Sequence, residues 1–243
     1  MIQQPLIMEE LTMEEFKAGL AMTKTVLVPF GSVEAHGNHL PLSTDTIQAY
    51  EVGKKAAVRI PLFVAPPIPY GNCRSTSSLP GTISITTKTI KHLLKDIVQS
   101  SYRHGLRNFI ILSGHAGSAH CMALQDSGEE LIRKFDDIKM AVLVEFELAS
   151  NGAKEIIETI DDRHAGEIET SRILHSHPNL VKGTGTEEYP TFPYGILVRD
   201  KQRYWPHGVW GNPGKASNKK GQVIEESVVA KIVDVVHALE NYR

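Results

Sequence analysis

Cysteine and aromatic side chains are scarce in this chain, and neither sign of charge dominates. The 243 residues include only two cysteines, Cys73 and Cys121. Two cysteines exclude a disulfide framework and are typical of proteins in a reducing compartment. Lys and Arg number 26 and Asp and Glu number 28, which gives a formal net charge of -2. This near balance argues against a nucleic-acid partner bound through net charge.

Long apolar runs are also absent. No stretch approaches the length that a transmembrane helix needs, so we expect no membrane partner. Residues 1–16 contain four glutamates and no basic segment, which is not the pattern of a secretory signal peptide. These features predict a cytoplasmic protein.

Short apolar runs alternate with longer stretches of helical period, and the 41% hydrophobic content predicts a packed core. Strands that are apolar on both faces and separated by helices indicate a parallel sheet covered on both sides. The fold class is therefore α/β, a three-layer sandwich with a mostly parallel central sheet, and we expect one domain over residues 1–243. The expected strands are 25–30, 62–65, 108–112 and 141–146, and the expected helices are 44–58, 86–104 and 117–136.

The last third of the sequence combines two expected helices with a long segment that lacks a periodic pattern. A helix is expected from near Ala165 to about His175, and a final helix over roughly 217–240. Between them, residues 177–219 are rich in Gly and Pro and too long for a simple connection. We expect this segment to shape a site or a subunit contact, with loop 204–213 as the contact surface.

Residues 31–46, directly after the first expected strand, hold the strongest functional signal. They include Glu34, His36 and Asp45. Carboxylate and imidazole together are the ligands of zinc, manganese and iron in catalytic sites. Glu34 and His36 are two apart, which places both side chains on one side of an extended backbone.

A second turn, residues 113–118, follows the third expected strand and contains His115. The carboxyl ends of strands in an open α/β sheet are where ligands bind, so the two turns can converge there. Taken singly, Asp45 is equally well explained as a helix N-cap and His115 as a turn residue bonded to backbone. Their joint pattern favours metal ligands.

A third segment, residues 163–171, lies at an expected helix start. His164 and Glu167 are three apart and would share a helix face, whereas Glu167 and Glu169 cannot. One of the two acids should face the site. The alternative is that both simply favour the helix dipole at its N-terminus.

The chain resembles the creatininase (creatinine amidohydrolase) family in residues 31–46, 113–118 and 164–171, and also in 80–82 and 208–213. The resemblance implies a homo-oligomer, often a hexamer, with two divalent ions (zinc, manganese or iron) per chain. Glu34 and His115 would hold one ion, His36 the other, and Asp45 both. In creatininase, the second metal position is completed by a Glu two residues after the His of the turn that follows the third strand. Here the residue two after His115 is Gly117. We expect Glu167 to replace it, with Glu169 as the less favoured substitute.

The reaction implied by the resemblance is hydrolysis of an amide C–N bond by water that the metal pair activates. His164 is the candidate that carries a proton to the leaving nitrogen. Its alternative role is to orient a ligand.

The residues expected to line the substrate pocket differ from those of creatininase. That enzyme covers its substrate with tryptophans before the His-Ala-Gly element, whereas this chain has no Trp between residues 141 and 164. The expected substrate contacts are Arg74 and Ser75, in a hydroxyl-rich stretch, and Trp205 in the Gly- and Pro-rich segment 177–219, called the late loop below. An arginine there would suit an anionic group. We therefore expect a small-molecule amide or formamide other than creatinine.

Two alternatives stay open. One is a peptide-trimming metallopeptidase of the same family. The other is a non-catalytic or regulatory binding member of the fold, which Gly117 favours. A nucleotide-binding protein is disfavoured because no Gly-rich phosphate loop follows the first strand. Among the remaining candidates, His39 and His120 are expected to support ligands at most, and Cys73 to be a plain buried cysteine.

Overall fold

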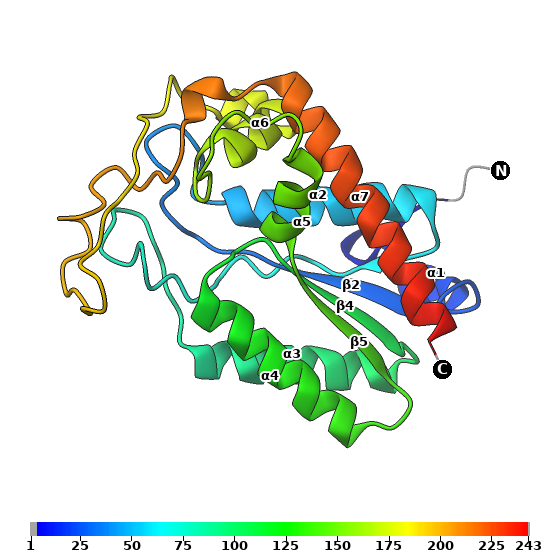
Figure 1. The fold of residues 1–243 in the computed structure, drawn as a ribbon. Coiled ribbons are helices and arrows are strands. Elements are labelled where there is room, and N and C mark those ends of the chain that lie inside the picture. The colour runs from blue at the N-terminus through cyan, green and yellow to red at the C-terminus, as the bar shows by residue number, and fades with distance from the viewer. Residues whose placement is uncertain (1–3, 243) are drawn as a thin grey trace.

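The computed structural model describes residues 4–242, which contain a five-stranded sheet with every strand parallel to its neighbours (Figure 1). The strand order is β1-β3-β2-β4-β5. The strands are β1 (Leu6–Ile7), β2 (Thr25–Phe30), β3 (Phe63–Val64), β4 (Asn108–Ser113) and β5 (Lys139–Val144). Because the strands are parallel, their carboxyl ends meet along one edge of the sheet.

Helices cover both faces of this sheet (Figure 1). One face carries α2 (Thr44–Arg59), α5 (Glu145–Ala153), α6 (Glu167–Ser176) and α7 (Asn218–Asn241). The other carries α1 (Met13–Gly19), α3 (Thr87–Arg103) and α4 (Ser118–Lys134). Short 3-10 turns lie at η1 (Met8–Glu10), η2 (Pro178–Leu180) and η3 (Pro213–Lys215). The predicted α/β sandwich is confirmed.

Strand β2 shows why the sheet is covered on both sides. All six of its residues are buried. Leu27 packs with the cluster under α2 and α7, whereas Val26 and Val28 pack with the cluster under α3 and α4. Each such side chain stabilises the fold by roughly 1.5–3 kcal/mol when it is fully buried. A strand that is apolar at every position therefore has to lie between two helical layers.

Most expected elements lie within two residues of their observed bounds, and β2 begins and ends as predicted. The expected strand 141–146 is displaced, since β5 ends at Val144 and α5 begins at Glu145. The reason is that Glu145 is fully buried in an ion pair with Arg172 of α6, with 2.5 Å between Oε1 and Nη2. Elements β1, α1 and α5 were not anticipated.

The helix expected from Ala165 begins at Glu167. Asp162 caps it, because its carboxylate accepts hydrogen bonds from the backbone N–H groups of Glu167 (2.6 Å) and Ile168 (2.9 Å). Ala165 has a φ of +51°, which no helical residue adopts. The late region from 177 contains only the short turns η2 and η3 before α7 begins at Asn218, as expected.

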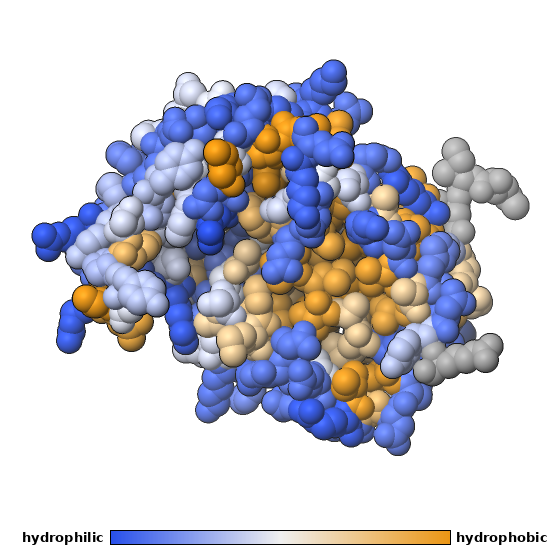
Figure 2. All heavy atoms as spheres, in the orientation of Figure 1, coloured by the Kyte–Doolittle hydropathy of each residue, from blue (hydrophilic) through white to orange (hydrophobic). Residues whose placement is uncertain are grey.

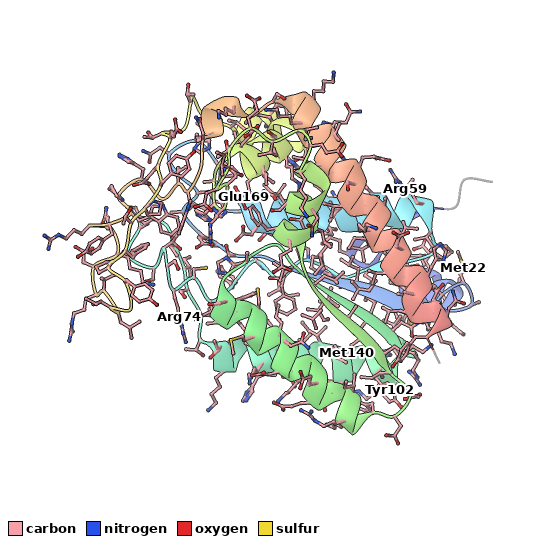
Figure 3. All side chains as sticks on the ribbon, in the orientation of Figure 1. Met22, Arg59, Arg74, Tyr102, Met140 and Glu169 are labelled. Carbon is pink, nitrogen blue, oxygen red and sulfur yellow. The ribbon has the colours of Figure 1, made fainter. Side chains whose placement is uncertain are left out.

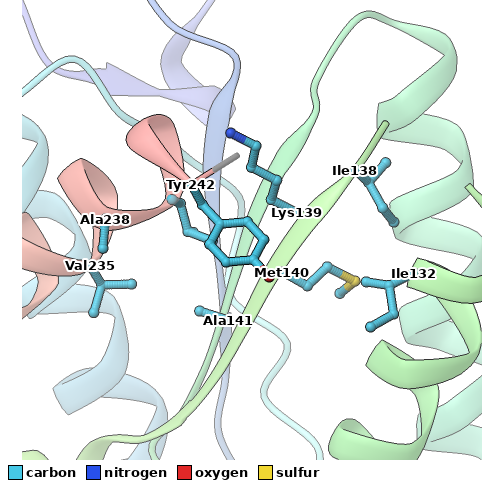
Figure 4. A pocket seen from close by; sticks show the side chains of 9 residues that line it. Ile132, Ile138, Lys139, Met140, Ala141, Val235, Ala238 and Tyr242 are labelled. Carbon is cyan, nitrogen blue, oxygen red and sulfur yellow. The ribbon is translucent and has the colours of Figure 1, made fainter. Parts of the chain in front are cut away.

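An apolar hollow of about 400 Å³ lies near the amino end of β5, between α4 and α7 (Figure 4). Its lining residues are Ile132, Ile138, Lys139, Met140, Ala141, Val235, Ala238, Leu239 and Tyr242. Figure 2 shows apolar side chains reaching the surface between the polar outer faces of these helices. No helix within residues 4–242 is long and apolar enough to cross a membrane.

Candidate active site

Two glycines at strand ends allow α2 to begin against the carboxyl edge of the sheet. Gly31 follows β2, and a Cβ there would lie 2.5 Å from the Cα of Thr46. Gly114 follows β4, and a Cβ there would lie 2.0 Å from the carbonyl oxygen of Asp45. Since real Cβ atoms do not approach backbone so closely, only glycine lets the first turn of α2 sit between the two strand ends. This close approach places Asp45 at the centre of the site.

The carboxylate of Asp45 faces a histidine on each side. Its Oδ1 lies 3.0 Å from Nε2 of His36, and its Oδ2 lies 3.1 Å from Nδ1 of His115. The Ser32 hydroxyl donates to Oδ2 at 2.6 Å and fixes the carboxylate plane. Asp45 is 2% exposed. It therefore presents one oxygen to each of two ligand groups, as the expected bridging role requires.

Both imidazoles are held by a backbone carbonyl on the far side of the ring. His36 Nδ1 lies 3.0 Å from the carbonyl oxygen of Glu34, and His115 Nε2 lies 3.2 Å from that of Asn72. In a neutral imidazole, a ring nitrogen that donates to a carbonyl leaves the other nitrogen with its lone pair. In His36 and His115 the other nitrogen is the one that faces the carboxylates. This is the orientation of a metal-binding imidazole.

Glu34 has one satisfied oxygen and one that is not. The Thr76 hydroxyl donates to Oε1. Oε2 is buried and accepts no hydrogen bond from the described residues, although Nδ1 of His115 lies 2.7 Å away. A buried carboxylate oxygen without a hydrogen-bond donor is costly unless a cation or proton compensates it. The donor set and this unpartnered oxygen fit a bound divalent cation.

The electrostatics of the cluster lead to the same conclusion. Glu34, Asp45 and Glu169 are all at most 4% exposed, and their ion partners within residues 4–242 are imidazoles. Burial opposes the charged form of His36, but the carboxylates of Asp45 and Glu169 outweigh it and raise its pKa to about 10. Burial raises the pKa of Glu169 to about 7, and the charge of Asp45 adds to this effect while His36 opposes it. Three desolvated carboxylates require compensating positive charge at this place, which charged imidazoles or a bound cation can supply.

Glu169, and not Glu167, supplies the carboxylate of α6 to this cluster. Oε1 of Glu169 lies 3.8 Å from Nε2 of His36. The backbone N–H of Ala165, in its left-handed conformation, donates to the other carboxylate oxygen. His36, Asp45 and Glu169 form a group whose ligand atoms all lie within 4.8 Å of one another. Figure 3 labels Glu169, which lies in the first turn of α6.

Glu167 faces away from the cluster, so the expectation that its side chain completes the site is wrong in geometry. Its carboxylate accepts hydrogen bonds from the backbone N–H of Thr159 at 2.8 Å and from that of Glu158 at 3.1 Å, and it pairs with Lys220 of α7. Burial alone would raise the pKa of Glu167, but these donors lower it. Glu167 ties the turn before α6 to the start of α7.

The glycine at position 117 is itself a packing requirement. A Cβ there would lie 2.4 Å from Nε2 of His115. A glutamate at this position would force the imidazole out of its contact with the Asn72 carbonyl. The chain therefore has His115 in its present orientation and a carboxylate from α6 in place of one at 117.

His164 precedes α6 in extended backbone and forms a bridge with Trp210 of the late loop. Its Nε2 lies 2.9 Å from the carbonyl oxygen of Ala35, and its ring packs on that of His36 with centroids 4.2 Å apart. Trp205 packs edge-on against His164 at 5.2 Å. Burial lowers the pKa of His164 to about 4, helped by the neighbouring His36. The imidazole is therefore neutral at pH 7, with Nε2 placed to donate to the carbonyl of Ala35.

A cavity of about 420 Å³ opens above this cluster. Its lining residues are Glu34, Asp45, Ser75, His115, Ala116, Gly117, Ser118, Phe146, Glu147, Arg163, His164, Glu169, Phe192, Trp205 and Trp210. Ser75 and Trp205, two of the expected substrate contacts, are among these lining residues. Arg74 is exposed and does not line the cavity; Figure 3 labels it on the loop after β3. Arg163 provides the guanidinium of the wall instead, packed over Trp210 at 4.8 Å.

Three segments far apart in the sequence build these walls. The loops after β2 and β3 meet the late loop at one end of the molecule (Figure 1). The backbone N–H of Gly37 donates to the carbonyl of Gly208, and Nζ of Lys201 donates to the carbonyl of Arg74 at 2.8 Å. The late loop therefore supplies the tryptophans that residues 141–164 lack.

The supporting residues are placed as follows. His39 is buried with Nε2 2.8 Å from the Thr170 hydroxyl, and His120 packs edge-on against His115 at 5.2 Å, so neither belongs to a ligand group. Cys73 is fully buried, as expected, but it lies in one group with Glu34 and His115. The sequence predicted only a plain buried cysteine at this position, because no periodicity or motif spacing links it to Glu34 or His115.

The sequence comparison agrees with this geometry. A family model described as Creatininase, creatinine amidohydrolase, matches residues 9–236. The chain belongs to the creatininase family. Creatininase-family proteins are hydrolases, and the fold is accordingly that of a creatininase-like α/β sandwich.

Individual relatives differ in what they act on. The creatinine amidohydrolase of Pseudomonas putida is 29% identical over 93% of this chain and 94% of its own length. A mycofactocin precursor peptide peptidase of Mycobacterium ulcerans is 31% identical over 84% of this chain and 81% of its own length. A crystal structure of creatinine amidohydrolase superposes with a TM-score of 0.87 at 26% identity, covering 99% of this chain and 100% of that one.

Proposed function

We propose that this protein is a metal-dependent amidohydrolase that uses two divalent ions to hydrolyse a C–N amide bond of a small molecule, a cyclic amide or a formamide other than creatinine. One observation carries the proposal. Asp45 presents one carboxylate oxygen to His36 and the other to His115, at the floor of a cavity lined by further carboxylates. Glu169 supplies the acid that Gly117 lacks, which supports the catalytic reading over the non-catalytic one.

The residues that would hold the ions fall into two sets. Glu34 and His115 would hold one ion, His36 and Glu169 the other, and Asp45 would contact both. Bound at this place, a metal pair supplies a water nucleophile at neutral pH and polarises the amide carbonyl. Zinc, manganese and iron all suit mixed carboxylate and imidazole ligands. Solved relatives include a creatininase with manganese and one of Zn–Zn type.

His164 performs the proton transfer in this proposal. Its Nε2 is occupied by the carbonyl of Ala35, so Nδ1 would take up the proton that the attacking water loses and pass it to the departing nitrogen. The bridge to Trp210 and the ring contact with His36 hold the imidazole in one orientation. General acid-base transfer by a positioned histidine contributes typically about 10²–10⁴-fold in rate.

The aromatic wall selects flat substrates and excludes water. Phe146, Phe192, Trp205 and Trp210 line the cavity, and the two indole rings pack edge to face at 6.2 Å. Trp205 donates its indole N–H to the carbonyl of Val209, which fixes its ring. A cavity of about 420 Å³ fits a small molecule. Arg163 and Ser75 offer donors to a polar or anionic substituent.

A peptide substrate is the second candidate. It is favoured by the likeness to the mycobacterial peptidase and by exposed apolar side chains on the late loop, Tyr194, Ile196 and Leu197. An extended peptide could lie across these side chains while its terminal bond enters the cavity. The same exposed side chains suit a subunit contact, and we propose a homo-oligomer, a hexamer by family resemblance.

Metal analysis and a substrate screen test the proposal together. The purified chain should contain about two transition-metal ions, and the metal-loaded protein should release amine or ammonia from a cyclic amide or an N-formyl compound faster than from creatinine. Short peptides in the same screen distinguish the second candidate. A protein that binds no divalent metal and hydrolyses none of these compounds would refute the proposal.

A further inference from the structure

We propose that Cys73 is a ligand of the metal position that Glu34 and His115 hold. This inference rests on the proposed metal-dependent function and adds a residue type to it. One of the two positions then contains a thiolate, whereas the other contains only carboxylates and imidazole.

The geometry of the group carries the inference. The Sγ of Cys73, a carboxylate oxygen of Glu34 and a ring nitrogen of His115 all lie within 4.8 Å of one another. Ligand atoms of a tetrahedral zinc ion, bound at about 2.0–2.3 Å, lie roughly 3.3–3.8 Å apart. The three side chains would therefore have to close slightly around one ion to bind it together. Cys73 is fully buried, so bulk water does not compete with its thiol for that ion.

A second observation is independent of the cysteine. Oε2 of Glu34 is buried and accepts no hydrogen bond of good geometry from the described residues, although Nδ1 of His115 lies 2.7 Å from it. Glu34 needs a positive partner on the side where it meets His115 and Cys73. The carboxylate of Glu34 and the thiol of Cys73 thus belong to the same group of possible ligands.

The backbone around Cys73 is fixed from three directions. The N–H of Cys73 donates to the Ser84 hydroxyl at 2.9 Å. The N–H of Asn72 donates to Nδ1 of His120 at 3.2 Å, and the carbonyl of Asn72 lies 3.2 Å from Nε2 of His115. The residue that precedes Cys73 therefore holds the ring of His115, which links the position of the thiol to that of the imidazole.

The other cysteine provides a contrast. Sγ of Cys121 donates to the backbone carbonyl of His115 at 3.5 Å, and its side chain is partly exposed. It belongs to none of the ligand groups found within residues 4–242. Two cysteines thus lie near the same histidine, but only Cys73 faces its ligand side.

The chemical consequence is a difference in metal preference. On binding, the Cys73 S–H bond breaks, the proton goes to solvent and an Sγ–metal bond forms. A thiolate favours zinc or cobalt over manganese, whereas carboxylates also suit manganese. The position with Glu34, Cys73 and His115 should select zinc, and the position with His36 and Glu169 should accept either metal.

Cobalt substitution tests the inference on the full-length protein. The cobalt-loaded wild type and the matched control Cys121→Ser should both show an intense thiolate-to-cobalt charge-transfer band in the near ultraviolet. Cys73→Ser should lose this band and still bind cobalt through the remaining ligands. X-ray absorption of the zinc-loaded wild type, which needs no variant, should show a zinc–sulfur distance of about 2.3 Å.

The outcomes separate this inference from the proposed function. A wild type that binds about two cobalt ions without the band or a zinc–sulfur distance overturns the role of Cys73 and leaves the hydrolase proposal intact. A band that persists in Cys73→Ser also overturns it. Failure of the wild type to bind cobalt and zinc at all overturns both. Competition between zinc and manganese adds a second readout, since Cys73→Ser should lower the zinc preference at least tenfold.

Discussion

The loop after β2 and the start of α6 both deliver carboxylates and imidazoles to one cluster, but they differ in how far the sequence identifies them. In the loop, Glu34, His36 and Asp45 all lie where the sequence placed them. At α6, the sequence favoured Glu167 and the structure brings in Glu169. The comparison teaches that a ligand tied to a strand end is easier to recognise than one whose direction depends on helix phase.

The physical reason lies in what fixes each side chain. Glu34 and His36 follow a buried strand, so chain direction alone brings them to the carboxyl edge. The direction of Glu167 or Glu169 depends on where the helix begins, and that depends on the cap from Asp162 and on the left-handed backbone of Ala165. A shift of two residues turns a helix by about 200° and exchanges inside for outside.

The largest expected effect is that of Asp45→Asn. Because Asp45 faces both histidines, its loss should remove the shared ligand and reduce the metal content of the protein below one ion per chain. Activity should fall on the order of a thousandfold or more. Asp126→Asn, which alters only a surface pair with Lys91, is the matched control. An Asp45→Asn protein with full metal content would contradict the shared role.

A direct test of the comparison is the pair Glu169→Gln and Glu167→Gln. Glu169→Gln should lose about one metal ion and on the order of a hundredfold or more in kcat, with an unfolding midpoint close to wild type. Glu167→Gln should keep metal and activity and lose about 1–3 kcal/mol of unfolding free energy, because Lys220 and two backbone N–H groups lose a charged partner. Metal analysis, kinetics and urea unfolding measure the three quantities.

The reverse result would restore the sequence-based assignment. If Glu167→Gln lost metal and Glu169→Gln did not, α6 would have to be rotated in solution relative to the arrangement described here. Equal losses in both variants would point to a general destabilisation of α6, which the unfolding midpoints would reveal.

A smaller effect is expected from the hydroxyls that hold the ligands. Ser32 donates to Asp45 and Thr76 donates to Glu34, so Ser32→Ala and Thr76→Ala should each weaken metal binding about 10–100-fold. Chelator competition measures the affinity. Ser77→Ala, which loses only a bond to the Arg74 carbonyl, is the control. Unchanged affinity in both variants would show that the carboxylates need no support.

The smallest effect concerns the substrate wall. Arg163→Ala should raise KM for an anionic amide by up to about tenfold and leave kcat and neutral substrates nearly unchanged, because Arg163 lines the cavity. Arg74→Ala should change neither, since Arg74 is exposed and outside the cavity lining. Steady-state kinetics on a matched anionic and neutral substrate decide between the two arginines. A larger effect of Arg74→Ala would favour the earlier assignment.

Much of the fold could be predicted because its elements carry strong local signals. β2 is apolar at each of its positions, and α2, α3 and α4 show a clear helical period, so their bounds agree closely with expectation. β5 was displaced because Glu145 looks like a strand end in sequence and becomes a buried helical residue only through Arg172. β1, with two residues, gives no periodicity to detect.

The sequence by itself determined the α/β class, the strand ends that carry the candidate ligands, and which histidines and carboxylates follow them, because chain direction and hydrophobic period are local properties. The tertiary structure decided which acid of α6 faces the cluster, that Arg163 rather than Arg74 lines the wall, that the late-loop tryptophans cover His164, and that Cys73 lies beside Glu34. These are contacts between segments separated by tens of residues or more, and they depend on helix phase and loop packing, which no local pattern records.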